Sequence, residues 1–112
     1  MKPVISFDEY DKIEVRVGRI VEALVPEGSN KLIMFRVDFG SEIGQKTIFS
    51  GIKEWYSPEE LVGIKTIWVV NLVPKKTPFG ESEGMLFACD RTDGRPYIVR
   101  IDAEVENGSE FH

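Results

Sequence analysis

Hydrophobic and polar residues alternate in several short stretches of the chain, which is the pattern of β-strands with one buried face. The stretch IEVRVGRIVEALV (13–25) shows it best, since Ile13, Val15 and Val17 fall on one face. Gly18 interrupts this stretch and predicts a bulge or bend in the strand. The predicted strands are 13–25, 31–40, 45–51, 64–72, 84–90 and 96–101.

Capping signals predict two short helices. Ser6 and Glu9 form a capping box, which indicates a helix over about 7–12. Ser57 is a candidate N-cap, and Pro58 suits the first position of a helix of one or two turns. Turn residues are concentrated at 26–30, 41–44 and 91–95, and a longer loop is expected at 73–83.

The order of these elements indicates the fold class. Five strands come first, and a short helix lies between the third and the fourth. The connections are mostly tight, which favours antiparallel pairing. This order predicts an all-β OB-fold, a partly open Greek-key barrel, over about 13–90 of a single domain spanning 1–112. An SH3-like barrel is the main alternative, but it lacks the helix after the third strand. The N-terminal helix and a C-terminal extension (91–112) with one strand are additions to the barrel.

The charge of the chain is acidic but uneven. Its 14 Lys and Arg residues face 19 Asp and Glu, a net charge of −5, which argues against nonspecific binding to nucleic acid. Residues 102–112 hold four acids and no Lys or Arg, so the rest of the chain is nearly neutral and a local basic patch is compatible with it. The single cysteine, Cys89, cannot form an internal disulfide, and no apolar run approaches the length of a membrane span. These features predict a cytoplasmic protein.

The residues needed for most catalytic chemistry are missing. The only histidine, His112, is the last residue, so neither a zinc cluster nor a nucleophile–histidine pair is expected. No phosphate-binding loop ending in Gly-Lys-Ser/Thr occurs. We therefore expect no enzyme activity, no metal and no cofactor.

The only adjacent pair of basic residues, Lys75 and Lys76, lies between Pro74 and Pro78. The prolines restrict the loop, so less conformational entropy is lost when it binds. An OB-fold contacts its ligand on strands 2 and 3 and on the loops joining strands 1–2 and 4–5. The lysine pair falls in the 4–5 loop, where each lysine can neutralise a phosphate.

Six strings, in matching order over about 7–101, resemble the tRNA-binding domain family. They are VRVGRIVEA (15–23), KLIMFRVDFG (31–40), KTIFSGI (46–52), PEELVGIK (58–65), VVNLVPKK (69–76) and GESEGMLFA (80–88). The family includes stand-alone tRNA-binding proteins, the archaeal methionyl-tRNA synthetase beta subunit and the C-terminal domain of bacterial methionyl-tRNA synthetases. The resemblance implies an OB-fold that binds tRNA by shape, usually as a homodimer.

The resemblance also implies a set of tRNA-binding residues. Positions that match the family's binding surface are Lys31, Ser50, Asn71, Lys75, Lys76, Ser82 and Met85. Arg36 is added because it lies on the outward face of the second predicted strand, where it either contacts the nucleic-acid backbone or forms a cross-strand ion pair. Asn71 interrupts an apolar strand and either satisfies a neighbouring loop or faces a base. Met85 is either part of the core or a flexible contact.

Two functions follow from this reading. The first is a tRNA-binding module, acting alone or with methionyl-tRNA synthetase. The second is a protein-interaction module, since CsaA-type export chaperones share the fold and bind unfolded polypeptides, and an acidic surface repels RNA. The segment 91–112 exceeds what a five-stranded barrel needs, so it is expected to take part in dimerisation.

Overall fold

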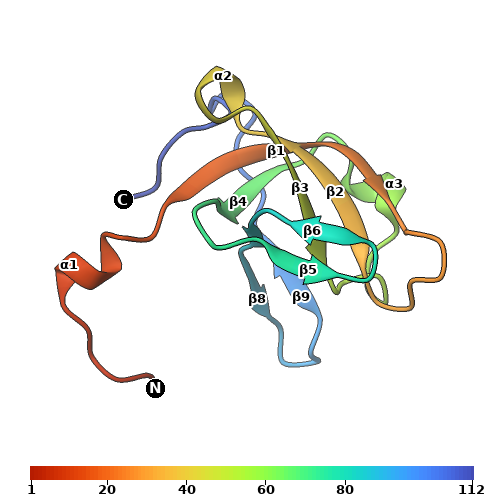
Figure 1. Ribbon diagram of the computed structural model, residues 1–112, viewed down its shortest axis with the longest axis horizontal. Helices are drawn as coiled ribbons and strands as arrows, with labels where there is room; N and C mark the ends of the chain where they lie inside the picture. Colours follow the sequence, from red (N-terminus) through yellow and green to blue (C-terminus); the bar gives the residue numbers. More distant parts are fainter.

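The computed structural model describes all 112 residues, and an antiparallel five-stranded sheet that curls into a barrel forms its centre (Figure 1). The strands of the barrel are β1 (Val15–Leu24), β2 (Ile33–Asp38), β3 (Gln45–Ser50), β4 (Lys65–Val69) and β7 (Met85–Leu86). Their spatial order is β3-β2-β1-β4-β7, so β4 pairs with β1 as a Greek key requires. The two edges nearly meet, since the N–H of Glu83 donates to the carbonyl of Thr47 in β3 (2.8 Å). The predicted OB-fold is confirmed.

Three short helices and two β-hairpins lie outside the five-stranded sheet. The helices are α1 (Phe7–Tyr10), α2 (Gly40–Ile43) and α3 (Pro58–Leu61), and the additional strands are β5 (Lys75–Thr77), β6 (Gly80–Ser82), β8 (Ala88–Asp90) and β9 (Pro96–Ile98). The helix α3 lies between β3 and β4 as predicted, and the side chain of Ser6 caps α1 by accepting from the N–H of Glu9. None of the helices reaches the length and hydrophobicity that crossing a membrane requires.

Three segments differ from the prediction. The segment expected to be a turn after β2 forms the single-turn helix α2, which begins at Gly40 and is capped by Gly44, both with positive φ. The expected loop 73–83 contains the hairpin β5–β6. The expected strand 84–90 is divided, because β7 pairs with β4 whereas β8 pairs with β9. The chain therefore passes at Phe87 from the barrel into a separate two-stranded hairpin.

A tryptophan packed against a glycine forms the centre of the core. Trp68 is fully buried and meets Phe35 and Phe39 edge to face, with ring centroids 5.9 and 6.3 Å away. Its indole N–H donates to the carbonyl of Gly18 in β1 (3.0 Å). A Cβ atom at Gly18 would lie 2.5 Å from Phe39 and Val37 and 2.8 Å from Trp68. Gly18 is thus required by the closeness of the core side chains.

The bulge that the sequence placed at Gly18 lies elsewhere. Gly18 stays in regular register opposite Thr66 of β4. The irregularity is in the pairing of β1 with β2, between Ile20 and Glu22. The prediction of a bulge at Gly18 was wrong, because glycine in a strand can also mark a close approach of neighbours, and here it packs against the tryptophan. The bend, the other alternative, stays a prediction.

The C-terminal tail folds back onto the first half of β1. The N–H groups of Gly108 and Phe111 donate to the carbonyls of Val17 and Val15 (2.7 and 3.0 Å), and the N–H of Val17 donates to Ser109 (2.9 Å). This part of β1 pairs with β4 on its other side, whereas β2 pairs only from Arg19 onward. The tail therefore occupies the edge that β2 leaves open.

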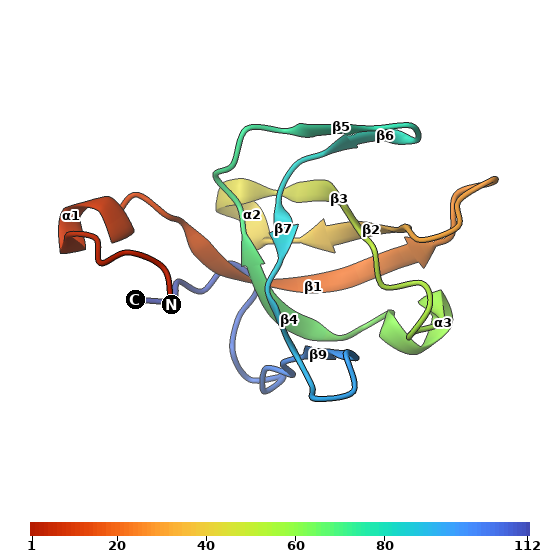
Figure 2. The same ribbon diagram turned by 90° about the horizontal axis from the view of Figure 1, so that it is seen from below.

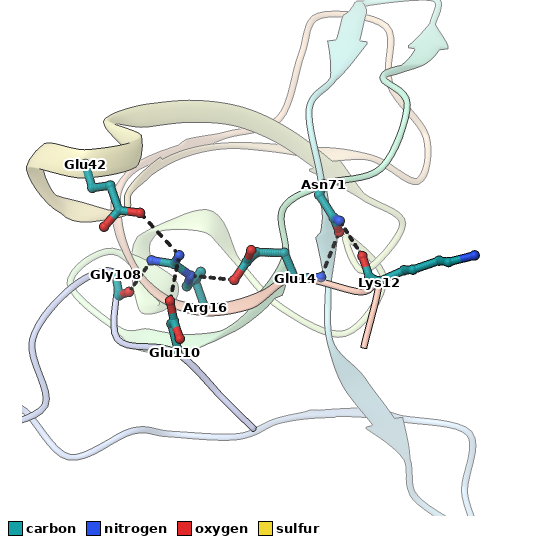
Figure 3. Close-up of polar contacts among 7 residues, drawn as sticks. All are labelled: Lys12, Glu14, Arg16, Glu42, Asn71, Gly108 and Glu110. Atoms are coloured by element: carbon teal, nitrogen blue, oxygen red, sulfur yellow. Dashed lines mark hydrogen bonds and ion pairs between the residues drawn. The ribbon is translucent and has the colours of Figure 1, made fainter. Parts of the chain in front are cut away.

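Arg16 contacts three carboxylates, and one of them, with a backbone carbonyl, joins the tail to the barrel (Figure 3). Its buried guanidinium contacts Glu14 (2.9 Å), Glu110 (3.1 Å) and Glu42 (3.4 Å), and it donates to the carbonyl of Gly108 (2.9 Å). The hydrogen bond to Glu14 raises the pKa of Arg16 above its usual value, and the charges of the carboxylates add to this against the opposing effect of burial. One cation thus joins β1, α2 and the tail.

The packing at Gly18 makes a first prediction. Gly18→Ala should lower the free energy of unfolding by about 1–3 kcal/mol, because the added methyl group overlaps the rings of Phe39 and Trp68. Gly51→Ala is the matched control, since a Cβ atom there meets nothing within 4 Å. Urea denaturation of both variants measures the difference, and equal midpoints would contradict the role assigned to Gly18.

The Arg16 cluster makes a second prediction. Arg16→Gln should release the tail, so that the amides of Gly108 and Phe111 exchange with solvent roughly tenfold faster, as expected for lost charge-assisted hydrogen bonds. Arg91→Gln is the control, because Arg91 and Asp93 are exposed and 3.9 Å apart, a geometry that adds little stability. Native-state hydrogen exchange measures both, and unchanged protection of the tail in Arg16→Gln would show that backbone pairing alone holds it.

Candidate nucleic-acid interface

A pocket of about 540 Å³ lies between the hairpin β5–β6 and the ends of β2 and β3. Figure 2 shows this hairpin standing above the barrel, joined to it through the segments leading from β4 and into β7. Five of the eight predicted binding residues line the pocket: Ser50, Lys75, Lys76, Ser82 and Met85. The fold therefore brings most of the predicted binding residues, from three separate segments, into one pocket.

The lysine pair is exposed on a structured hairpin. Lys75 pairs with Ser82 and Lys76 with Glu81 in the register of β5 and β6. At the tip, the hydroxyl of Thr77 donates to the carbonyl of Gly80 (2.7 Å) and accepts from the N–H of Phe79 (3.1 Å). Neither lysine forms an ion pair, so both ammonium groups are available to a ligand.

Ser82 and Glu83 fasten the hairpin to β3. The buried hydroxyl of Ser82 accepts from the N–H of Phe49 (3.0 Å) and donates to the carbonyl of Gly84 (3.1 Å). The carboxylate of Glu83 accepts from the N–H of Thr47 (2.8 Å). These bonds occupy the hydroxyl and one carboxylate oxygen, so both side chains set the position of the lysines.

The lining of the pocket contains no acidic side chain. Its floor is apolar and consists of Leu32, Phe49, Leu72, Val73 and Met85. Phe49 lies directly under the hairpin, since a Cβ atom at Gly80 would be 3.6 Å from its ring. Sequence reasoning missed all of these except Met85. The available signal was that strands 2 and 3 of an OB-fold face its ligand, which places Leu32 and Phe49 near the site.

Met85 is 43% exposed, so its side chain belongs to the surface and not to the core. It contributes to this pocket and also to a separate groove lined mostly by hydrophobic residues. Of the two alternatives that the sequence left open, the structure thus excludes the core, and the role of Met85 as a contact stays a prediction.

Lys31, Arg36 and Asn71 lie outside the lining of the pocket. Lys31 is exposed and precedes Leu32, a residue of the floor. Arg36 donates to the side-chain oxygens of Gln45 (3.1 Å) and Thr47 (2.9 Å). It therefore makes cross-strand hydrogen bonds to β3 in place of the ion pair that was one of its two alternatives.

The side-chain amide of Asn71 is occupied by backbone (Figure 3). Its oxygen accepts from the N–H of Glu14 (2.8 Å), and its nitrogen donates to the carbonyl of Lys12 (2.6 Å). Asn71 thus satisfies a neighbouring segment, the first of its two alternatives, and fastens the chain entering β1 to the end of β4.

The arrangement suits a ligand that carries anionic groups beside an apolar face. The lysines at the rim attract phosphates, and the restrained hairpin holds them in place before the ligand arrives. The apolar floor can contact the face of a base or an apolar side chain. Nucleotides and extended peptides both offer such a face, so the geometry alone admits both.

Comparisons with known proteins separate the possibilities further. The family model described as "Putative tRNA binding domain" matches residues 15–110. A methionine–tRNA ligase from Thiobacillus denitrificans is 46% identical over 110 residues, which cover 93% of this chain and 16% of that protein. The chain thus spans about one sixth of the length of the curated relatives it matches.

Solved structures resemble the whole chain. A MetRS-related protein from Pyrococcus horikoshii superposes with a TM-score of 0.91 at 38% identity, covering 99% of this chain and 100% of its own. The CsaA chaperone protein from Picrophilus torridus gives a TM-score of 0.87 at 29% identity, covering 97% and 100%. The resemblance of the six strings to the tRNA-binding domain family is therefore supported by a matching family model and by solved structures with the same fold. The chain belongs to the tRNA-binding domain family.

Proposed function

We propose that the protein binds tRNA without catalysing a reaction, and that it acts in translation in the cytoplasm as an auxiliary of methionyl-tRNA synthetase. The observation that carries the proposal is the carboxylate-free pocket with two unpaired lysines on its rim, in a chain of net charge −5. Such a local arrangement selects phosphates at one place, whereas the rest of the surface gives little nonspecific attraction.

The roles within this site differ from residue to residue. Lys75 and Lys76 contact phosphates, Ser50 and Met85 contact the nucleotide that enters the pocket, and Ser82 positions the hairpin. Lys31 and Arg36 extend the contact along the exposed side of β2 as weaker phosphate contacts. Asn71 acts through the structure, since its amide is already bonded to Lys12 and Glu14.

We further propose that the protein is a homodimer. A groove of about 420 Å³ is lined by Lys2 and nine hydrophobic residues. The hydrophobic residues include Ile13, Phe87 and, from the C-terminal segment, Phe111. The helix α1 buries none of its residues and projects from the barrel (Figure 1). Exposed hydrophobic side chains gathered in one groove are typical of a protein interface. A second copy of the chain presents the same groove and the same helix, so a two-fold arrangement covers both at once.

A dimer also binds tRNA with higher affinity than a monomer. Each protomer offers one lysine hairpin, and linking two modest sites raises the overall affinity by roughly 100-fold or more when both reach the same ligand. This is how a chain with a net charge of −5 binds RNA at physiological salt with two exposed lysines at each site.

A CsaA-like protein-interaction module is the second candidate. The apolar floor of the pocket favours it, because an extended polypeptide can place hydrophobic side chains there. Val73, which is 90% exposed, would then matter more than the lysines. If Val73→Ser abolished capture of an unfolded polypeptide, and neither the wild type nor any variant bound tRNA, this function would replace the first.

The tRNA proposal predicts a specific change in salt dependence. Lys75→Ala/Lys76→Ala should weaken tRNA binding and reduce the slope of log K against log salt by about 1.4–1.8 for each protomer that contacts the tRNA, because two phosphate contacts per protomer no longer release counterions. Lys46→Ala/Arg91→Ala removes two charges away from the pocket and is the control for net charge. Fluorescence anisotropy with labelled tRNA from 50 to about 200 mM salt measures all three proteins. Equal slopes for the two double variants would show that the hairpin is not the phosphate contact.

The dimer proposal predicts a difference between two well-matched substitutions. Ile13 and Val62 are both β-branched and both 48% exposed, but only Ile13 lines the groove. Ile13→Ser should raise the dimer dissociation constant by roughly 10-fold or more, since a buried aliphatic side chain is lost from the interface, whereas Val62→Ser should leave it unchanged. Sedimentation velocity over a concentration series measures the constant. A wild type that sediments as a monomer at micromolar concentration excludes the dimer.

A further inference from the structure

A second, basic pocket lies on the side of the barrel opposite the lysine hairpin. It has a volume of about 290 Å³ and forms where the α3–β4 connection meets the segment that follows β9. Three of its seven lining residues are Arg19, Lys65 and Arg100, and none is acidic. Figure 2 shows the hairpin β5–β6 on one side of the barrel and strand β9 with the start of β4 on the other.

Two of these cations are placed against each other by the sheet itself. Arg19 of β1 and Lys65 of β4 are direct partners in the antiparallel register. Like charges in such positions repel each other and destabilise a sheet. The neighbour of Arg19 on the other side is Asp38 of β2, but its carboxylate accepts from the N–H of Gly40 (2.8 Å) and makes no ion pair with Arg19. Neither Arg19 nor Lys65 therefore has a carboxylate partner at this place.

The ammonium of Lys65 is fixed in position. It donates to the carbonyls of Ala103 (3.0 Å) and Val105 (2.7 Å), and the carbonyl of Lys65 accepts from the N–H of Ile101 (3.0 Å). These bonds hold the segment 101–105 against β4 and so form one wall of the pocket. They leave one N–H of the ammonium for another partner.

The guanidinium of Arg19 extends over a glycine. A Cβ atom at Gly63 would lie 3.9 Å from its Nη2, so the side chain reaches across the α3–β4 connection into the pocket. Arg100 is exposed and enters from the opposite wall. The four ion pairs of the protein involve only Arg16 and Arg91 as cations, so all three charges of this pocket are free of carboxylate partners.

We propose that this pocket binds a phosphate group. Two guanidinium groups and one ammonium suit a tetrahedral oxyanion, because arginine presents paired N–H donors and lysine a point charge. A bound dianion gives Arg19 and Lys65 the anionic partner that the fold does not provide. The volume equals that of roughly ten water molecules at about 30 Å³ each, which accommodates a phosphate with part of its hydration.

The phosphate can belong to an RNA backbone or to a free phosphate ester. Both sources share the chemistry that the pocket recognises. This pocket lies across the barrel from the lysine hairpin. The phosphate proposal therefore does not depend on the tRNA proposal, and either can fail without the other.

The first measurement is a titration with inorganic phosphate at constant ionic strength, followed by amide chemical shifts. The amides of Lys65, Ile101 and Ala103 should shift in the wild type. Arg19→Gln/Arg100→Gln should weaken this binding by roughly 10-fold or more, as expected for the loss of two charge-assisted contacts. Lys75→Gln/Lys76→Gln should leave it unchanged. Because Arg100 lies outside the strands, Arg100→Gln alone serves as a second variant that leaves the pairing of β1 with β4 intact.

The result that overturns the proposal is a phosphate titration that moves no amide of this pocket, or one that is the same in the wild type and in both arginine variants. A second arm identifies the source of the phosphate. If Arg19→Gln/Arg100→Gln also reduces the salt slope of tRNA binding, the pocket takes a phosphate of the RNA backbone. If the slope is unchanged while phosphate binding is lost, the pocket serves a free phosphate ester.

Discussion

The contact between Trp68 and the backbone at Gly18 is the constraint on which the rest of the structure depends. The indole fills the barrel only because β1 has no side chain at that position, and its N–H compensates the carbonyl that the ring covers. Val37 and Phe39 reach the same place from the end of β2. Side chains from β4 and from the end of β2 thus converge on one missing methyl group of β1, and the path of β1 across the core follows from it.

The course of β1 in turn determines what surrounds the barrel. Its first half pairs with β4 and with the tail, whereas its second half pairs with β2, and the register irregularity between Ile20 and Glu22 lies in that second half. The first half of β1 is paired on both edges and so leaves no open edge there for unwanted pairing. It also brings Arg16 beside the tail and Asn71 beside the entry to β1, so that both termini are anchored by polar side chains at this strand.

The sequence was sufficient to predict the barrel and to place the lysine pair between its fourth and fifth strands. It was not sufficient to predict the surfaces around that pair. Alternation and the enrichment in β-branched and aromatic residues identified β1 to β4, because each has one face in the core. The strands β5, β6 and β7 have two or three residues, too few to establish a period, so their segment was taken as a loop and part of a longer strand. The roles of Gly18 and Asn71 depend on partners about 50 residues away, which alternation cannot reveal. The apolar floor of the pocket was not predicted for the same reason, since Leu32, Phe49 and Val73 come together only in the folded chain.

The distribution of charge explains how an acidic chain keeps basic sites. Arg16 binds three carboxylates, and the amide of Thr47 binds a fourth, that of Glu83. These acids are directed into contacts within the fold, and none of them lines either basic pocket. Because charges near a surface act mainly within a Debye length of about 8–10 Å, an anion approaching a pocket responds to the lysines and arginines at its rim more than to the net charge. Local placement, and not composition, therefore determines where this protein can attract an anion.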